Sequence, residues 1–423
     1  MKGEIMEDLT IFNNLKKPLK IDRPIRLIEL FAGIGSQAKA LERLGANFEH
    51  YRVCEFDKYA IKSYNAVHGT DFVASDITQI TADDLGIVDT DQYAYICCYS
   101  FPCQDLSIAG KQKLMAKGSG TRSSLLWEVE RLLNECQELP QILLMENVTQ
   151  VHGKKNKAYF NEWIKFLENK GYSNYWRDLN AKNFGIPQNR NRTFMVSVLG
   201  DYIYEFPEEF SLALRLKDKL EESVDERFYI KNFESITAVN KEYSMINGGS
   251  IGKMHDVSRR VYWEDGISPT IHTCGGGNTE PKVIAGIGEK KSNGGTQWYQ
   301  QDRIYDDEVA ISVTTAFNPY YAVAMRGRYN EDGKIEQNIE LSDREYANAI
   351  TTVQKDSLVA GPCSIENLHI RKLTPKECWR LMGFEDEDFE KAATVNSNTQ
   401  LYKQAGNSIV VDVLYYIFKN MLE

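Results

Sequence analysis

The alternation of short apolar runs with amphipathic stretches between residues 25 and 200 constrains the fold more than any other feature of the chain. The runs IRLIELFAG, HYRVCEFD, YAYICCYS, QILLMENV and TFMVSVL have the composition of buried strands. Before the fourth run, SSLLWEVERLLNEC places Leu126, Val129 and Leu133 at helical spacing. Strands that alternate with helices predict an α/β fold with a doubly wound, mostly parallel sheet. Ligands of such sheets bind at the carboxyl ends of the strands.

The pattern changes from about residue 205 to 360, where Gly, Asn, Thr and Tyr are frequent and β-like runs are short. A loose repeat is visible, because NGG at 247–249 leads to RVY at 260–262, and NGG at 293–295 leads to RIY at 303–305. ANAITTV is a weaker third copy. The irregular spacing favours repeated β-hairpin units in a second, smaller domain over a solenoid.

Composition narrows the class of protein. A length of 423 residues predicts two or three folded units. No apolar run approaches the roughly 18 residues that a membrane span needs, and MKGEIMEDLTIFNNLKK lacks the apolar core of a secretory signal, so we expect a cytoplasmic protein. Eight cysteines without a CxxC pair predict neither a metal site nor a disulfide framework.

The charge distribution bears on nucleic-acid binding. The net charge of −10 disfavours phosphate contacts, which need Lys and Arg. Residues 151–200 are an exception, with nine basic residues against three acidic ones. We expect the acidic run EDEDFE at 385–390 to face solvent rather than DNA.

Three segments that each follow an apolar run predict a pocket for adenosine. LFAGIGS contains Gly33 and Gly35, which let backbone approach a ligand at a helix start. Glu55 ends the next run and can accept two ribose hydroxyls, while the ring of Phe56 can stack on adenine. Asp76 is expected at a third strand end, where it can accept from an adenine amino group. The glycines alone permit either a nicotinamide cofactor or S-adenosylmethionine.

SFPCQDLSIAGKQ is more specific, because Cys103 directly follows an apolar strand on a turn fixed by Pro102. This position predicts a nucleophilic thiolate exposed at the mouth of the sheet. Cys97 and Cys98 lie inside the strand and are predicted to be inert core residues.

Two further segments supply charged groups to the same crevice. MENV places Glu146 at the end of its strand, where partial burial would keep a general acid protonated. FGIPQNRNR places Arg190 and Arg192 before another strand, where each can bind a polar ring or a phosphate in a bidentate manner, or form a structural ion pair.

FAGIGS, EFDKYA, SDIT, FPCQDLSIAGK, ENV, QNRNR, RKLTPKECWRLMGF and QAGNSIVVDVL occur in the order found in DNA cytosine carbon-5 methyltransferases. On these motifs, which cover about 25–198 and 370–418, the chain resembles that family in its bacterial or phage modification type. The region between them looks like the target recognition domain, which differs among members. Ser36 is a departure, because many members carry another glycine there.

The resemblance implies an S-adenosylmethionine-dependent methyltransferase fold with a second, smaller DNA-recognition domain. The catalytic domain would comprise 1–198, completed by 398–423, and the recognition domain 199–397. Double-stranded DNA would lie between the two domains, with the target cytosine flipped out of the duplex. A monomer is implied, with no membrane contact and with a cognate restriction endonuclease that acts separately.

The resemblance also assigns residue roles. Cys103 would attack carbon 6 of cytosine while Glu146 binds nitrogen 3, Arg192 would fix the cytosine carbonyl, and Arg190 would support its strand. The loop after Cys103 would close over DNA as a lid. S-adenosylmethionine would be bound by residues from both ends of the catalytic domain. These residues are Phe31, Gly33, Gly35, Glu55, Phe56, Asp76, Ile77, Asn407 and Ser408. The resemblance implies no metal ion.

Three alternatives remain at this point. A tRNA cytosine methyltransferase would use the same chemistry, although the full-length recognition region favours duplex DNA. An inactive DNA-binding relative would not need Cys103, Glu146 and Arg192 together. A nicotinamide oxidoreductase with a redox cysteine is permitted by the Gly-rich loop.

Overall fold

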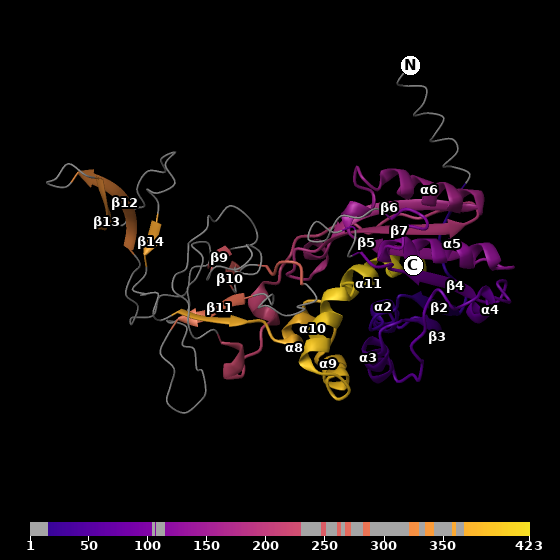
Figure 1. Ribbon diagram of the computed structural model, residues 1–423, viewed down its shortest axis with the longest axis horizontal. Helices are drawn as coiled ribbons and strands as arrows, with labels where there is room; N and C mark the ends of the chain where they lie inside the picture. The colour runs from indigo at the N-terminus through magenta and orange to yellow at the C-terminus, as the bar shows by residue number, and fades with distance from the viewer. Residues whose placement is uncertain are drawn as a thin grey trace, which may run out of the picture.

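The computed structural model describes residues 16–103, 106, 115–229, 267–271, 283 and 371–423 with their side chains. It also describes the backbone of strands that lie between 247 and 370 (Figure 1). Residues 104, 105 and 107–114 of the predicted lid after Cys103, and the second and third copies of the repeat, lie outside these residues.

A six-stranded sheet of order β3-β2-β4-β5-β7-β6 forms the centre of the N-terminal part. Four strands are parallel: β2 (Ile25–Leu30), β3 (Phe48–Cys54), β4 (Ala94–Tyr99) and β5 (Ile142–Asn147). β7 (Asn191–Leu199) runs antiparallel to β5, and β6 (Tyr172–Asn180) runs antiparallel to β7. The predicted mostly parallel sheet is confirmed. Sequence reasoning missed β6, because this edge strand buries little and its sequence YSNYWRDLN is mostly polar.

Helices cover both faces of the sheet, so the prediction of a doubly wound fold is confirmed. On one face, α2 (Ser36–Arg43) and α11 (Val411–Leu422) share a core with Leu27, Cys98 and Leu144. On the other face, α5 (Leu126–Glu135) and α6 (Lys157–Asn169) share a core with Ile28, Cys97 and Leu143. Cys97 and Cys98 are 2% and 0% exposed, as predicted for core residues.

Further helices and two short strands complete the part of the chain that is described with its side chains. The α-helices are α3 (Lys58–His68), α4 (Ala82–Leu85), α8 (Pro375–Arg380), α9 (Asp386–Ala393) and α10 (Asn398–Asn407). The strands β1 (Lys17–Pro18) and β8 (Tyr202–Ile203) pair in parallel. Single 3-10 turns are η1 (Arg122–Leu125), η2 (Thr149–Val151), η3 (Ala181–Phe184), η4 (Leu216–Lys219) and η5 (Glu226–Phe228).

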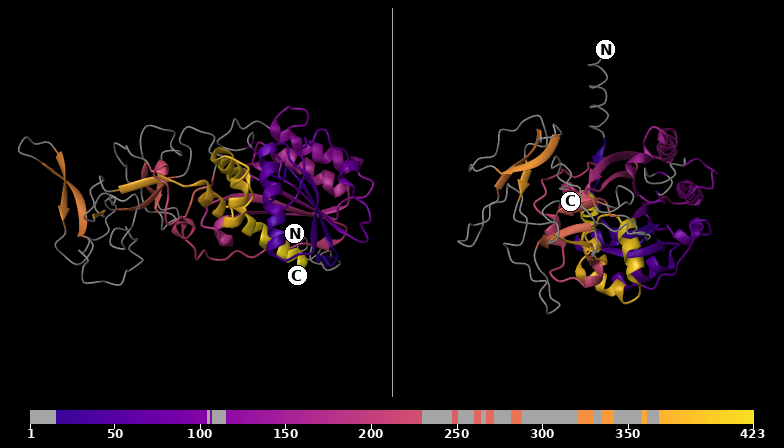
Figure 2. Two further views of the ribbon diagram at one scale, coloured as in Figure 1. Left: turned by 90° about the horizontal axis from the view of Figure 1, so that it is seen from below. Right: turned by 60° about the vertical axis from the view of Figure 1, so that its left-hand side comes forward.

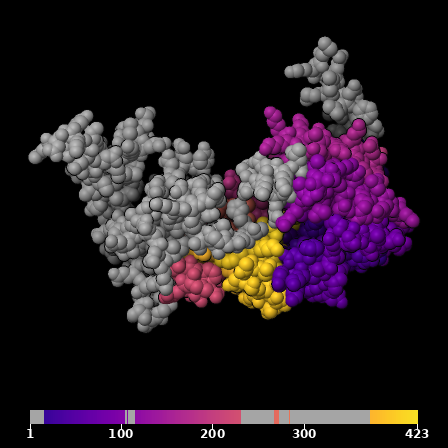
Figure 3. Space-filling model, in the orientation of Figure 1, coloured from indigo at the N-terminus to yellow at the C-terminus, as the bar shows by residue number. Residues whose placement is uncertain are grey.

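The C-terminal segment returns to the N-terminal part of the chain. α11 lies beside α2, the first helix of the sheet domain (Figure 2). The backbone N–H of Ile21 donates to the carbonyl of Met421 at 2.8 Å, and the Tyr204 hydroxyl donates to the carbonyl of Ile417 at 3.1 Å. In Figure 3 the C-terminal residues lie between the N-terminal part and the segment near residue 220. Arg380 donates to the Leu220 carbonyl across that boundary at 3.0 Å.

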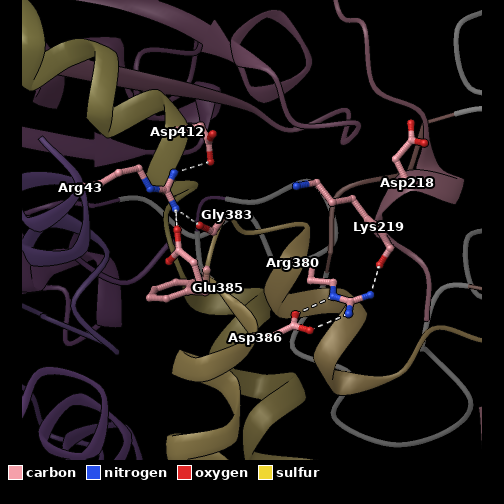
Figure 4. A pocket seen from close by; sticks show the side chains of 9 residues that line it. Arg43, Asp218, Lys219, Arg380, Gly383, Glu385, Asp386 and Asp412 are labelled. Carbon is pink, nitrogen blue, oxygen red and sulfur yellow. Dashed lines mark hydrogen bonds and ion pairs between the residues drawn. The ribbon is translucent and has the colours of Figure 1, made fainter. Parts of the chain in front are cut away.

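The prediction for the acidic run at 385–390 holds only in part, because Glu385, Glu387 and Glu390 are exposed to solvent whereas Asp388 is buried. Asp388 is 2% exposed and lies 2.8 Å from Lys39 of α2. Glu385 pairs with Arg43, also of α2, at 2.6 Å (Figure 4). The run therefore fastens α9 to the sheet domain, which net charge along the sequence could not reveal.

Two smaller sheets lie in the second part of the chain. One has the order β15-β11-β10-β9, and the other has the order β13-β12-β14. Their strands are β9 (Asn247–Ser250), β10 (Arg260–Trp263), β11 (Lys282–Ile287), β12 (Tyr321–Tyr329), β13 (Ile335–Leu341), β14 (Leu358–Ala360) and β15 (Leu368–Lys372). β9 and β10 are antiparallel, so the first copy of the repeat does form a paired unit. Among the described residues, no helix has the length and apolar character needed to cross a membrane.

Candidate active site

The loop that carries Cys103 follows β4 and is held from two neighbouring elements. The Ser123 hydroxyl donates to the Pro102 carbonyl at 2.8 Å, and the Asn147 amide donates to the Phe101 carbonyl at 2.9 Å. Ser123 and Asn147 are 0% and 1% exposed. Sequence reasoning missed both residues as supports of this loop, although Asn147 belongs to the ENV motif.

The Cys103 side chain is half-buried, which changes the expected state of its thiol. Burial raises the pKa of Cys103, the Glu146 carboxylate raises it further, and the Arg192 and Arg190 charges oppose the rise. The structure therefore holds a thiol at neutral pH, where the sequence predicted an exposed thiolate. A nucleophilic role then requires that a proton leave the sulfur when substrate binds.

Glu146 lies in β5, directly opposite Phe194 of β7. Arg192 stands two residues before Phe194 and therefore comes close to Glu146. Arg192 Nε lies 3.2 Å from Glu146 Oε1, with side-chain exposures of 16% and 10%. Burial raises the pKa of Glu146, and Arg192 and Arg190 only partly oppose this effect. The direction of the shift is the one that a protonated general acid needs.

Arg190 has a different environment from Arg192. It is 4% exposed, and its guanidinium donates to the carbonyls of Ile271, Gly406 and Ser408 at 3.1, 3.0 and 2.7 Å. Burial lowers the pKa of Arg190 to about 9. The structure thus makes Arg190 a link between the start of β7, the second part of the chain and the C-terminal segment.

Gln188 makes a similar link, which sequence reasoning missed. Its amide nitrogen donates to the Leu381 carbonyl at 2.7 Å, and its amide oxygen accepts from Ile271 N–H at 3.1 Å. The side chain is fully buried. Its place in the FGIPQNRNR motif was the available signal.

The two glycines of the loop after β2 have different roles. Phe31 and Gly33 have φ values of +60° and +59°, and a Cβ added to Gly33 would meet nothing within 4 Å. A Cβ on Gly35 would lie 2.3 Å from His68 Nε2. Gly33 therefore leaves open space that a ligand can enter, whereas Gly35 is needed for packing. The positive φ of Phe31 is uncommon for a residue with a side chain, as at many ligand sites.

The residues after β3 border the same open space. Glu55 Oε2 accepts from Gly33 N–H at 2.9 Å, and its Oε1 accepts from Asp57 N–H at 2.8 Å. Burial raises the pKa of Glu55, and these two hydrogen bonds lower it in part. The Phe56 ring is 76% exposed, so one of its faces is available for stacking.

Asp76 and Ile77 lie on the next connection, but one expectation about them is wrong. Residues 70–76 form no strand, so Asp76 does not stand at a strand end. It lies on a turn in which its carboxylate accepts from Thr78 N–H at 2.9 Å. The Ile77 side chain is 4% exposed, and its carbonyl accepts from Arg131 of α5 at 3.0 Å. Sequence reasoning missed this support from Arg131.

The two C-terminal positions differ in exposure. Asn407 ends α10 and is exposed, whereas Ser408 is buried and its hydroxyl donates to the Gln404 carbonyl at 2.8 Å. Lys403 of the same helix pairs with Asp57 at 2.6 Å. α10 is thereby fastened beside the Glu55 turn.

The model of the C-5 cytosine-specific DNA methylase family matches residues 25–423. The chain belongs to this family. It is 30% identical over 452 residues to the type II methyltransferase M2.ScrFI of Lactococcus lactis subsp. cremoris, covering 94% of this chain and 99% of the relative. It is also 30% identical to the orphan methyltransferase M.SPRI of Bacillus phage SPR, covering 94% and 97% of the two chains.

Solved structures show the same fold. The Entamoeba histolytica methyltransferase EhMeth matches with a TM-score of 0.60 at 16% identity, covering 95% of this chain and all of that chain. The S. pombe Dnmt2 methyltransferase matches with a TM-score of 0.55 at 17% identity, covering 94% and 98%. Both support the predicted methyltransferase fold.

Family membership decides between the classes of enzyme left open by the sequence. The chain is a DNA cytosine carbon-5 methyltransferase, and its cofactor is S-adenosylmethionine. The nicotinamide oxidoreductase is therefore excluded. The resemblance to bacterial and phage modification enzymes is confirmed by the relatives.

Proposed function

We propose that this methyltransferase modifies one cytosine within a specific DNA sequence, through a covalent bond between that base and Cys103. The observation that carries this proposal is the convergence of Cys103, Glu146 and Arg192. The three side chains act on one another electrostatically, at the carboxyl ends of β4 and β5 and beside the start of β7.

The residues around Gly33 fit the adenosine part of S-adenosylmethionine. Gly33 faces open space, Glu55 offers carboxylate oxygens for ribose hydroxyls, and the exposed Phe56 ring can stack on adenine. Asp76, on its turn, can accept from the adenine amino group. When bound, the cofactor supplies the methyl group. Phe31, Gly35, Ile77 and Ser408 would shape the pocket through backbone and packing, and the exposed Asn407 could contact the ligand directly.

The active-site residues would then act in order on the flipped cytosine. The Cys103 thiol passes its proton to water and its sulfur attacks carbon 6, which raises the electron density at carbon 5. Carbon 5 then takes the methyl group and loses its proton to water, and the sulfur leaves carbon 6 as the ring double bond re-forms. Glu146, whose pKa is raised by burial, acts as the general acid that donates to ring nitrogen 3 as charge develops there. Arg192 donates to the cytosine carbonyl and holds Glu146 in place. Arg190 acts through position alone, since both of its terminal nitrogens are bound to carbonyls.

We further propose a division into a catalytic domain of 1–198 with 398–423 and a recognition domain within 199–397. The contacts of α11 with α2 support the first part. The Lys39 and Arg43 ion pairs support counting α9 with the catalytic body, so the recognition unit would end before it. The strands between 247 and 370 would then contact duplex DNA.

The proposal extends to the setting of the enzyme. We propose a cytoplasmic monomer that acts on double-stranded DNA, with any cognate restriction endonuclease as a separate protein. Relatives named as type II and as orphan methyltransferases both occur, so an endonuclease is not required by the family.

Covalent capture tests the chemistry. Fluorine at carbon 5 of the target cytosine cannot leave as a cation, so the enzyme should remain bonded to such DNA after methyl transfer. We expect an adduct on denaturing gels that requires S-adenosylmethionine and is absent with Cys103→Ser. Cys136→Ser is a matched control, because Cys136 is also half-buried but ends α5, away from the site. Failure of the wild-type enzyme to form an adduct on DNA that it methylates would overturn the covalent mechanism. Methylation of tRNA but not of DNA would overturn the proposal that DNA is the substrate.

A further inference from the structure

A polar cluster lies beside the Gly33 loop, and the proposed mechanism does not use it. The His68 cluster consists of Glu42 of α2, His50 of β3 and His68 of α3, and their polar atoms lie within 4.8 Å of one another. The His68 side chain is 0% exposed. A buried imidazole must find partners for both ring nitrogens inside the protein.

Both ring nitrogens of His68 face acceptors. Nε2 lies 3.1 Å from the Ile34 carbonyl, and Nδ1 lies 2.6 Å from Glu42 Oε1. A neutral imidazole carries one N–H, so it can satisfy only one of these acceptors, whereas an imidazolium donates to both. The geometry therefore requires one additional proton on the pair formed by His68 and Glu42.

The surroundings place that proton on His68. Burial alone would raise the pKa of Glu42, but the hydrogen bond from His68 and the nearby cations lower it overall. One of these cations is Lys39, whose Nζ lies 3.5 Å from Glu42 Oε2. Glu42 is thus an ionised carboxylate that stabilises a buried imidazolium.

His50 is the neutral member of the cluster. Its Nδ1 lies 2.8 Å from the Tyr64 hydroxyl oxygen, and that hydroxyl donates to the buried Glu29 at 2.6 Å. His50 Nδ1 is therefore a donor, and its other nitrogen faces Glu42 at 3.7 Å. Burial and the charge of His68 lower the pKa of His50 to about 4. Burial raises the pKa of Glu29 to about 7, so Glu29 is only partly ionised at neutral pH.

The imidazolium contacts the cofactor loop directly. Ile34 stands between Gly33, which faces the open space, and Gly35, whose missing Cβ leaves room for the His68 ring. The loop is consequently held at two adjacent residues, by Glu55 through Gly33 N–H and by His68 through the Ile34 carbonyl. Loss of the His68 contact would leave the Ile34 carbonyl without this partner, so the position of the neighbouring Gly33 would be less well fixed.

We propose that His68, in its protonated form, is a positioning residue that fixes the Gly33 loop in the conformation that binds S-adenosylmethionine. This inference rests on the proposed cofactor role of the loop. It predicts that cofactor affinity depends on a hydrogen-bond donor at position 68.

Calorimetric titration with S-adenosylmethionine, using the full chain, tests this role. Removing a donor from a buried carbonyl should weaken cofactor binding about tenfold in His68→Leu. His68→Gln retains a donor but cannot satisfy both acceptors as an imidazolium does, so it should recover only part of the affinity. DNA affinity and the single-turnover rate at saturating cofactor should stay within about twofold of wild type. His50→Gln is the control, because His50 belongs to the cluster without contacting the loop, and it should retain wild-type cofactor affinity.

NMR of protein labelled with ¹⁵N in histidine measures the protonation directly. At pH 7.5 one ring should carry protons on both nitrogens, and its signal should be missing from His68→Gln. A neutral ring at position 68, or wild-type cofactor affinity in a folded His68→Leu, would overturn the inference. If chelator weakens cofactor binding and Zn²⁺ restores it, the cluster holds a metal and the inference is also wrong. Absence of cofactor binding by the wild-type protein would instead contradict the proposed function.

Discussion

Arg190→Met removes the guanidinium that joins three separate parts of the chain. Methionine fills much of the same volume but cannot donate a hydrogen bond, so the carbonyls of Ile271, Gly406 and Ser408 all lose their partner. Orphaned buried acceptors cost about 1–3 kcal/mol each. The substitution also relieves the burial of a cation, which is the effect that lowers the pKa of Arg190 to about 9. With this offset, we expect a net loss of about 3 kcal/mol in the free energy of unfolding.

Thermal unfolding followed by circular dichroism measures this loss. A change of that size corresponds to a decrease in melting temperature of about 6–12 °C for a domain of this size class. Because two of the three carbonyls belong to Gly406 and Ser408, the cofactor should also bind more weakly. Arg190→Lys should be intermediate, since an ammonium replaces a planar group with several donors.

Arg192→Met is the matched control. Its guanidinium pairs with Glu146 and donates to the Asn191 carbonyl, with no bond to the C-terminal segment. It should lose turnover while retaining cofactor affinity. A melting temperature for Arg190→Met within about 2 °C of wild type, together with unchanged cofactor binding, would refute the reasoning, because the three carbonyl bonds would then contribute nothing.

Three other predictions concern the chemistry and the cofactor loop. Because the pKa of the Cys103 thiol is raised, the rate at limiting DNA should increase as pH rises from neutral toward that pKa, and a rate that falls over this range would contradict a resting thiol. Glu146→Gln should lower the single-turnover rate by about 10²–10⁴-fold with DNA affinity nearly unchanged, whereas loss of DNA binding with normal turnover of the bound complex would make Glu146 structural. Gly33→Ala should weaken cofactor binding and lower the melting temperature only through the backbone strain of its positive φ, since its Cβ meets open space, whereas Gly35→Ala should lower the melting temperature further because its φ is also positive and its Cβ would overlap His68. Equal effects of the two changes on stability would contradict this division.

The sequence alone determined the order of the elements and the loops that carry chemistry. Apolar runs such as YAYICCYS are buried on both faces, so their hydrophobicity is a local property that predicts strands without tertiary knowledge. The same applies to the site, because the turns after β2 and β4 place Gly33 and Cys103, and the last residues of β5 place Glu146, at one edge of the sheet. The resemblance to the family rests on these local motifs and is confirmed by the match over 25–423.

Tertiary structure decided what each of these residues does. Gly33 and Gly35 are alike in sequence, and only the position of the His68 ring distinguishes the ligand-facing glycine from the packing one. Arg190 and Arg192 are alike in sequence as well. In the structure, the Arg190 guanidinium donates to three carbonyls from distant segments, whereas the Arg192 guanidinium pairs with the buried Glu146 carboxylate. The protonation states of Cys103 and Glu146 likewise depend on burial and on charges brought from other strands. Desolvation and ion pairing act through space over a few ångströms. The protonation states therefore depend on residues far apart along the chain, and no local sequence pattern predicts them.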